Sequence, residues 1–198
     1  IINRQHNTAE DELGEDGPLK YNRVLGLDYN LASSDNTYTG KFYLHKSLSP
    51  NDTQGNTSWG TTLGYNTRTW NGFLDFSAID KEFVSDLGFI PRYDIFRVAG
   101  RLGYSIWPQK GAFNTHVFDS FHSQTYVMSR DYQQTDVFRN FGYEGRLKNL
   151  SQIEFSYNHR YTFLTDEFGP TRRDEDKPLE AQTEYTYGAV RIQYQSNP

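Results

Sequence analysis

The sequence contains no cysteine, which excludes disulfide frameworks, thiolate zinc sites and cysteine nucleophiles. It also lacks any run of about 18 apolar residues, the length that a transmembrane helix needs. An excess of basic residues is absent too, because the formal net charge is −5. Binding to nucleic-acid phosphates requires clustered Lys and Arg, so the composition argues against a nucleic-acid partner.

Tyrosine and phenylalanine supply much of the hydrophobic content. Apolar residues make up 35% of the 198-residue chain and aromatic residues 16%, with 15 Tyr and 14 Phe. This balance is typical of a thin sheet with one apolar face, and it differs from that of a deep aliphatic core.

Apolar and polar residues alternate with period two along almost the whole chain. In the segment around Gly100, for example, Val98 and Leu102 share one face, whereas Arg97 and Arg101 share the other. Such alternation predicts β-strands, and no helical period of comparable length competes with it. The segment 113–127 is also expected to be a strand, although its faces are mixed. We expect strands over 22–31, 38–47, 58–68, 70–78, 96–106, 113–127, 137–148, 151–163 and 183–195.

The connections between these segments alternate between short and long. Tight turns on one side of an up-and-down sheet and long loops on the other are typical of outer-membrane barrels. The expected strands are longer than the usual soluble strand of about 5–6 residues, and they suit a tilted membrane crossing. Short turns are expected at 32–36, 67–70, 107–112 and 148–151, and longer polar loops at 5–19, 48–57, 80–92, 129–136 and 165–182.

The predicted fold is all-β: an antiparallel up-and-down transmembrane β-barrel in the outer membrane of a Gram-negative bacterium. Residues 1–4 are expected to end one strand, and residues 196–198 to begin a turn. An open sheet would leave two unpaired edges in lipid, so we expect about nine strands as an internal part of a larger barrel. Residues 1–198 then form part of a single barrel domain whose partner is outer-membrane lipid.

Charged residues of the expected strands fall on their polar faces. A lipid-facing Arg or Lys near the bilayer midplane costs about 2–4 kcal/mol, so these side chains are expected to face the lumen. There they could set permeation or hold a plug, or they could pair within a packed interior that conducts nothing. The candidate lumen-facing charges are Asp28, Lys41, Arg68, Asp75, Arg97, Arg101, Glu144, Arg146, Glu154, Arg160 and Arg191.

Aromatic residues lie near the ends of several expected strands, where membrane proteins concentrate them at the lipid–water interface. The residues of this kind are Trp59, Trp70, Tyr104, Trp107 and Tyr161. In the long loops, Phe83, Phe89 and Phe168 are candidates for a sugar-stacking platform.

The sequence predicts no catalytic site and no cofactor. Carboxylate-rich loops can hold calcium, but neither acidic cluster has the spacing of a twelve-residue calcium loop, and both are expected to be solvated. The five histidines His6, His45, His116, His122 and His159 include no pair at the spacing of a helical zinc site. The acidic clusters are Glu10, Asp11, Glu12, Glu15 and Asp16, and Asp166, Glu167, Asp174, Glu175 and Asp176.

Two stretches carry a resemblance to a known family: YNRVLGLDYNL at 21–31, and the stretch from WGTTLGYN to YSIWP at 59–108. They resemble the C-terminal barrel region of a Bacteroidota outer-membrane family whose members place a carbohydrate-binding-module-like β domain before the barrel. INRQ at 2–5 is similar to the end of the preceding family strand. From about residue 112 onward the likeness is limited to the alternation. The segment that looks most like the family's signature has an acidic residue and a phenylalanine, followed by Leu-Gly-Phe and an arginine. Its residues are Asp80, Phe83, Leu87, Gly88, Phe89 and Arg92.

The sequence is compatible with three functions. The first is a non-enzymatic outer-membrane barrel, acting as a conduit, as a component that handles surface glycans, or as a structural subunit that assembles with other outer-membrane or periplasmic proteins. The second is a soluble or surface glycan-binding β protein with its site in the long loops. The third is a barrel enzyme, which requires a serine or an Asp–His pair at the outer rim.

Overall fold

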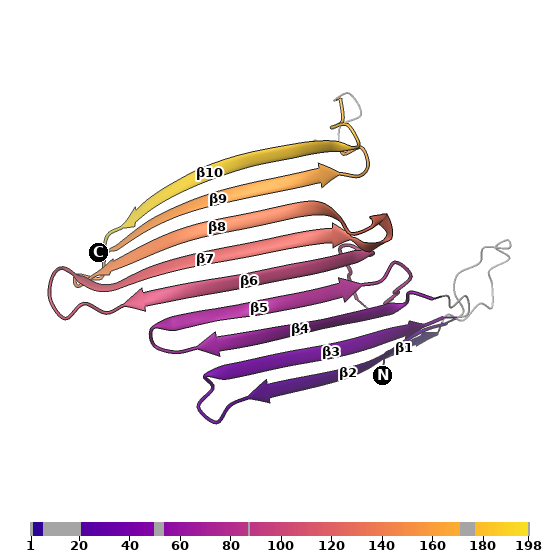
Figure 1. Ribbon diagram of the computed structural model, residues 1–198, viewed down its shortest axis with the longest axis horizontal. Helices are drawn as coiled ribbons and strands as arrows, with labels where there is room; N and C mark the ends of the chain where they lie inside the picture. The colour runs from indigo at the N-terminus through magenta and orange to yellow at the C-terminus, as the bar shows by residue number, and fades with distance from the viewer. Residues whose placement is uncertain (1, 6–20, 50–53, 87, 171–176, 198) are drawn as a thin grey trace.

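The computed structural model describes residues 2–5, 21–49, 54–86, 88–170 and 177–197, and for residues 2–5 it describes the backbone alone. The strands form one antiparallel sheet in chain order (Figure 1). The predicted all-β, up-and-down antiparallel arrangement is therefore confirmed. The elements are β1 (Ile2–Gln5), β2 (Tyr21–Ala32), β3 (Tyr38–Leu48), β4 (Thr57–Asn66), β5 (Trp70–Ile79), β6 (Ile95–Ile106), β7 (Phe113–Val127), the 3-10 turn η1 (Met128–Arg130), β8 (Gln133–Leu147), β9 (Gln152–Leu164) and β10 (Thr183–Gln195).

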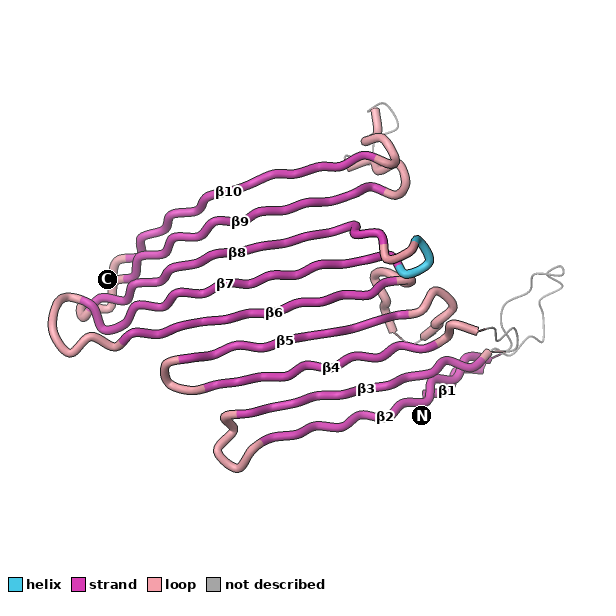
Figure 2. Tube along the Cα trace, viewed as in Figure 1, coloured by secondary structure: helices cyan, strands magenta, loops and turns pink. Residues whose placement is uncertain are grey.

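The sheet is open. Among the described residues, β1 pairs with β2 and β10 pairs with β9, but the two outermost strands do not pair with each other. Figure 2 shows the strands as one continuous layer. In the described ranges, no helix has the length and apolar character needed to cross a membrane. The backbone hydrogen bonds thus join nine long strands and the short β1, and they leave one edge on each side.

The antiparallel register keeps the alternation of each strand in phase with that of its neighbours. Leu74 lies opposite Leu63 on β4 and Gly100 on β6, and Phe76 lies opposite Val98. These residues therefore belong to one side of the sheet, which we call the apolar face. Its large hydrophobic side chains include Leu25, Leu27, Tyr29, Leu31, Phe42, Leu44, Trp59, Leu63, Leu74, Leu102, Phe118, Phe141, Phe155, Val190 and Ile192, all at least 39% exposed.

Aromatic rings gather near both ends of the strands on the apolar face. On the side of the short turns, the rings of Trp70 and Tyr104 lie 4.5 Å apart and those of Phe118 and Tyr143 lie 5.1 Å apart. These four residues form what we call the turn-side band. On the side of the long loops, the centre of the Phe96 ring lies 6.2 Å from that of Trp59 and 6.4 Å from that of Tyr126. These three residues form what we call the loop-side band.

The connections follow the predicted alternation with one exception. The link from β7 to β8 was expected to be a polar loop over 129–136, but this prediction is wrong because β8 already begins at Gln133. Asp131 and Tyr132 both have positive φ, so the chain reverses within the short η1 turn. The polar residues after Tyr132 pair with the end of β7, and this pairing outweighs their low apolar content.

The turn between β2 and β3 is organised around one carboxylate. The hydroxyl groups of Ser33 and Thr37 each donate a hydrogen bond of 2.6 Å to Asp35, and the backbone N–H of Thr37 donates another of 3.0 Å. Together these donors hold the pKa of the Asp35 carboxyl well below its usual range. The ionised carboxylate is therefore the form that stabilises the turn.

We expect the Asp35 turn to be stable at neutral pH and to loosen in acid. Because the folded-state pKa is lowered, the stabilisation is complete above the ordinary aspartate pKa of about 3.9 and is lost as the pH falls through the folded value. Hydrogen exchange of the Thr37 amide measures this: its protection should be constant from neutral pH to about pH 4 and should fall below that. An Asp35→Asn variant should lack this acid transition. Loss of protection in the unsubstituted protein well above pH 4 would contradict the assignment.

Candidate functional site: the polar face of the sheet

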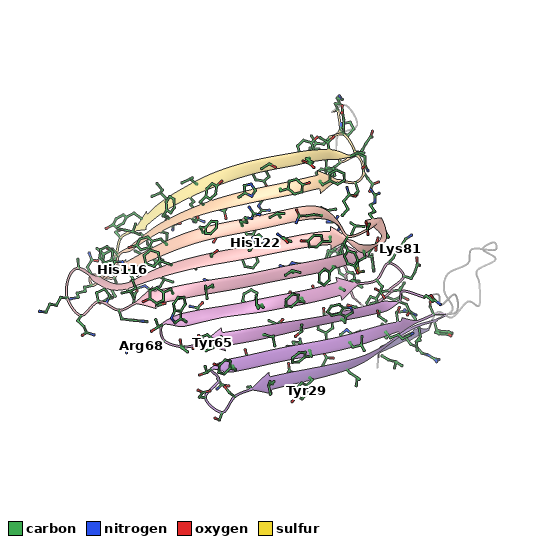
Figure 3. All side chains as sticks on the ribbon, viewed as in Figure 1. Tyr29, Tyr65, Arg68, Lys81, His116 and His122 are labelled. Carbon is green, nitrogen blue, oxygen red and sulfur yellow. The ribbon has the colours of Figure 1, made fainter. Side chains whose placement is uncertain are left out.

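The second side of the sheet, which we call the polar face, carries ten of the eleven predicted charges. Asn30 lies opposite Lys41, Lys41 opposite Thr62, and Thr62 opposite Asp75, so these residues share one side across four strands. The exception is Arg68. It lies in the turn beyond the end of β4 at Asn66, where Figure 3 labels it. Its guanidinium lies 5.0 Å from the centre of the Trp107 ring. The ten residues on the polar face are Asp28, Lys41, Asp75, Arg97, Arg101, Glu144, Arg146, Glu154, Arg160 and Arg191.

A chain of polar contacts crosses the polar face from β4 to β7. Asp75 accepts a hydrogen bond of 2.7 Å from the Thr62 hydroxyl and lies 3.7 Å from the Arg97 guanidinium. Arg97 Nε in turn donates to the Ser123 hydroxyl at 3.2 Å. Each of these contacts joins side chains on neighbouring strands. The charged groups of Asp75 and Arg97 therefore both have partners on adjacent strands.

One further ion pair and one imidazole–carboxylate contact join neighbouring strands. The Arg101 guanidinium lies 3.5 Å from Asp119, and the His45 imidazole lies 3.2 Å from Asp28. These side chains are between 23% and 51% exposed, so each pair contributes at most about 1 kcal/mol to stability. The pairs therefore determine where the charged groups lie on the polar face, but they contribute little to the stability of the sheet.

Near the short turns, two carboxylates face each other on β8 and β9. Glu144 lies directly opposite Glu154, a placement that is unfavourable for like charges. Each carboxylate has a donor on its own strand: Arg146 donates to Glu144 at 3.0 Å, and Gln152 donates to Glu154 at 2.6 Å. The donors offset the repulsion within each strand.

The remaining predicted charges make other contacts. The Arg160 guanidinium lies 4.6 Å from the centre of the Phe138 ring on the neighbouring strand. Arg191 donates a hydrogen bond to Gln193 on β10. Lys41 has no ion pair with any described residue. The polar face therefore holds a mixed set of charges, with paired and unpaired cations side by side.

The glycine at position 60 gives room to a large ring on the polar face. A Cβ built on Gly60 would lie 2.6 to 2.7 Å from atoms of the Tyr43 ring on the neighbouring strand. The outer end of the Tyr43 side chain therefore occupies the space that a side chain at position 60 would need. Any larger residue at Gly60 would displace it.

The connection from β5 to β6 folds onto the polar face. Phe83 in this connection is only 5% exposed. The backbone N–H of Val84 donates to the Ser47 hydroxyl at 3.1 Å, and the Asn22 amide donates to the Val84 carbonyl at 3.1 Å. Because Ser47 lies opposite Val24, in phase with Asp28, the loop covers the side of the sheet that carries the charges.

A cavity of about 440 Å³ lies between this loop and the strands. Phe83, Ser85 and Ile90 line it from the loop. From the sheet it is lined by Val24, Gly26, Asp28, Tyr43, His45, Ser58 and Ile79. Its polar groups are one carboxylate, one imidazole and several hydroxyls. Such a set could hold a small polar molecule by hydrogen bonds, but it provides no activated nucleophile.

The other predicted sites are not brought together. Phe83 cannot offer its ring to a sugar because it is buried, which corrects that prediction, whereas Phe89 is 91% exposed and Phe168 is 53% exposed. The first acidic cluster, part of the second (Asp174, Glu175 and Asp176) and His6 lie outside the described residues. Among the described residues, no group of three or more His, Asp or Glu side chains could hold a metal ion.

Sequence reasoning missed a polar row on the apolar face. His122 lies opposite Gly100 and Arg139, and Arg139 lies opposite His159 (Figure 3 labels His122 near the middle of the sheet). The signal was present in the alternation, because Arg139 is two residues from Phe141 and so falls on the same side.

The hydroxyls, carboxylates and cationic groups of the polar face can form hydrogen bonds with polar molecules, and the open pocket between the β5–β6 loop and the strands offers one place for this. No family model, no curated protein and no solved structure matches the chain.

Proposed function

We propose that the chain forms part of a non-enzymatic β-barrel of the Gram-negative outer membrane, with the apolar face against lipid and the polar face toward the interior. The observation that carries the proposal is the exposed apolar face. Its large hydrophobic side chains lie on β2 to β10, and the two bands of aromatic rings cross it between β4 and β8. The opposite side holds the ten predicted charges together with partners such as Asp119. Contiguous apolar surface of this extent is rare on soluble monomers.

The spacing of the two aromatic bands supports the proposal. Phe96 and Tyr104 are eight residues apart on β6, or roughly 27 Å along the strand. A barrel strand tilts by about 35–45° from the membrane normal, so the bands are separated by about 21 Å across the bilayer. This separation is close to the apolar band of about 25 Å in outer-membrane barrels.

The folded-in β5–β6 loop supports the assignment of the interior. A loop that packs on a lipid-facing surface would carry its backbone polar groups into hydrocarbon. The loop instead meets Asn22 and Ser47, which are on the polar face. Further strands would have to close the sheet, because its two edges carry unpaired backbone groups that lipid does not solvate.

Within this proposal the barrel acts as a conduit or as a structural subunit of an envelope assembly with other outer-membrane or periplasmic proteins. A soluble or surface glycan-binding protein is the second candidate, and the observation that favours it is the exposure of Phe89 and Phe168 in the loops.

Gel migration and detergent requirement test the two candidates. A closed barrel is expected to need detergent for extraction from membranes and to change its migration when the sample is boiled, because strand closure resists detergent until it is heated. Full solubility without detergent, with the same migration before and after boiling, would contradict the barrel and favour the glycan-binding protein.

A further inference from the structure

The row formed by His122, Arg139 and His159, which we call the midline row, lies halfway between the two aromatic bands. Gly100, opposite His122, is four residues from Phe96 in the loop-side band and four from Tyr104 in the turn-side band. A glycine lies at each end of the row: Gly100 is opposite His122 on one side, and Gly188 on β10 is opposite His159 on the other. The row therefore occupies the middle of the apolar face.

The midline row is polar, whereas Leu31, Leu63 and Leu74, the residues at the same level on β2, β4 and β5, are apolar. Arg139 is exposed and makes no hydrogen bond or ion pair with any described residue. Ser120 and Gln124 extend the polar area on β7, since both share the side of His122. In hydrocarbon an unpaired guanidinium is strongly unfavourable, and acyl chains cannot accept its hydrogen bonds.

The geometry points to a protein partner within the bilayer that covers β7, β8 and β9 at the midline row and presents a carboxylate to Arg139. This inference rests on the proposed function, since it requires the apolar face to be in the membrane. A carboxylate is the complementary group because it can accept two parallel hydrogen bonds from one guanidinium.

Lipid headgroups and a second copy of the chain fit the row less well. A headgroup stays near the interface, and the row is about 13 Å along the strand from either band. Two copies related by an axis along the bilayer normal meet at equal depth, so Arg139 would face only cations and imidazoles. On the apolar face of the described strands the acidic residue is Glu184, close to the start of β10 on the loop side.

Cysteine labelling in the full-length protein tests the inference, because this chain has no native cysteine to interfere. His122→Cys reports on the midline row. Leu74→Cys is the matched control, since Leu74 lies opposite Gly100 at the same depth and is 53% exposed. The probe is a lipid-soluble maleimide, applied to native outer membranes and to the purified protein in phosphatidylcholine vesicles.

We expect both variants to react equally in vesicles, where the partner is missing. In native membranes His122→Cys should react about tenfold more slowly than Leu74→Cys, the ratio for a site that is uncovered in one molecule in ten. Adding Arg139→Glu should restore the fast reaction in native membranes, because two carboxylates repel, whereas Arg139→Lys should keep the protection.

Equal rates in native membranes would show that lipid covers the row, and this would overturn the inference. Protection that persists in the vesicles would overturn it as well, because the cover would then belong to the protein itself. Unchanged protection in the Arg139→Glu variant would exclude the carboxylate. If neither variant reacts with the lipid-soluble probe in vesicles, the proposed function fails instead, since the apolar face is then not in lipid.

Discussion

Replacing Leu102 with arginine is expected to reduce the fraction of protein that folds into lipid vesicles by about 30- to 1,000-fold. Leu102 is 57% exposed on the apolar face, two residues from the midpoint between the aromatic bands. An arginine at such a depth costs about 2–4 kcal/mol, and every 1.4 kcal/mol is a factor of ten. Protease protection of the vesicle-inserted protein, measured in a urea series, gives the ratio.

Arg101→Ala is the matched control for Leu102→Arg, because it changes the neighbouring residue on the opposite side of the same strand. It removes only the half-exposed pair with Asp119, so folding should change by at most about 1 kcal/mol. If Leu102→Arg inserts as well as the unsubstituted protein, lipid does not contact this side of β6. The assignment of the two faces in the membrane would then be wrong.

Truncating Phe83 to alanine is expected to release the β5–β6 loop from the polar face. The ring is 5% exposed, and truncation of a buried phenylalanine costs about 3–5 kcal/mol. The amide of Val84, bound to the Ser47 hydroxyl, and the amide of Asp86, bound to Asn22, should then exchange at least about 100-fold faster with solvent. Hydrogen exchange with peptide-level detection measures both.

Phe89→Ala is the control for the Phe83 prediction, since it removes the same ring from the same loop at a position that is 91% exposed. It should leave the exchange of Val84 and Asp86 unchanged. Equal exchange in the Phe83→Ala variant and the unsubstituted protein would mean that the hydrogen bonds to Asn22 and Ser47 alone hold the loop in place.

The strands could be predicted from the sequence because each one repeats the same local pattern. For β7, β9 and β10 the predicted and observed limits agree within one residue, although the faces of β7 are mixed. The predicted limits were least accurate at β8, because residues 133–136 do not alternate between apolar and polar. These residues belong to the strand because they pair with residues on β7. Pairing between strands is a tertiary property that no single segment displays.

The polar face was predictable for the same reason, whereas the covering loop and the midline row were not anticipated. The burial of Phe83 depends on contacts with strands some sixty residues away along the chain, as the bond between Asn22 and Val84 illustrates. Arg139 follows from the alternation of β8, but its significance depends on its depth between two bands of rings contributed by several strands.

The β5–β6 loop is also attached at its far end. Arg92 donates to Asp136 at 2.6 Å and to the buried Thr135 at 3.1 Å, and Asp94 accepts a hydrogen bond of 3.0 Å from the backbone of Ser129. One segment thus links β2 and β3 to β8 across the four strands between them. Such a cross-link limits how far apart these non-adjacent strands can move, and it therefore restrains the curvature of the sheet without involving β1, β9 or β10.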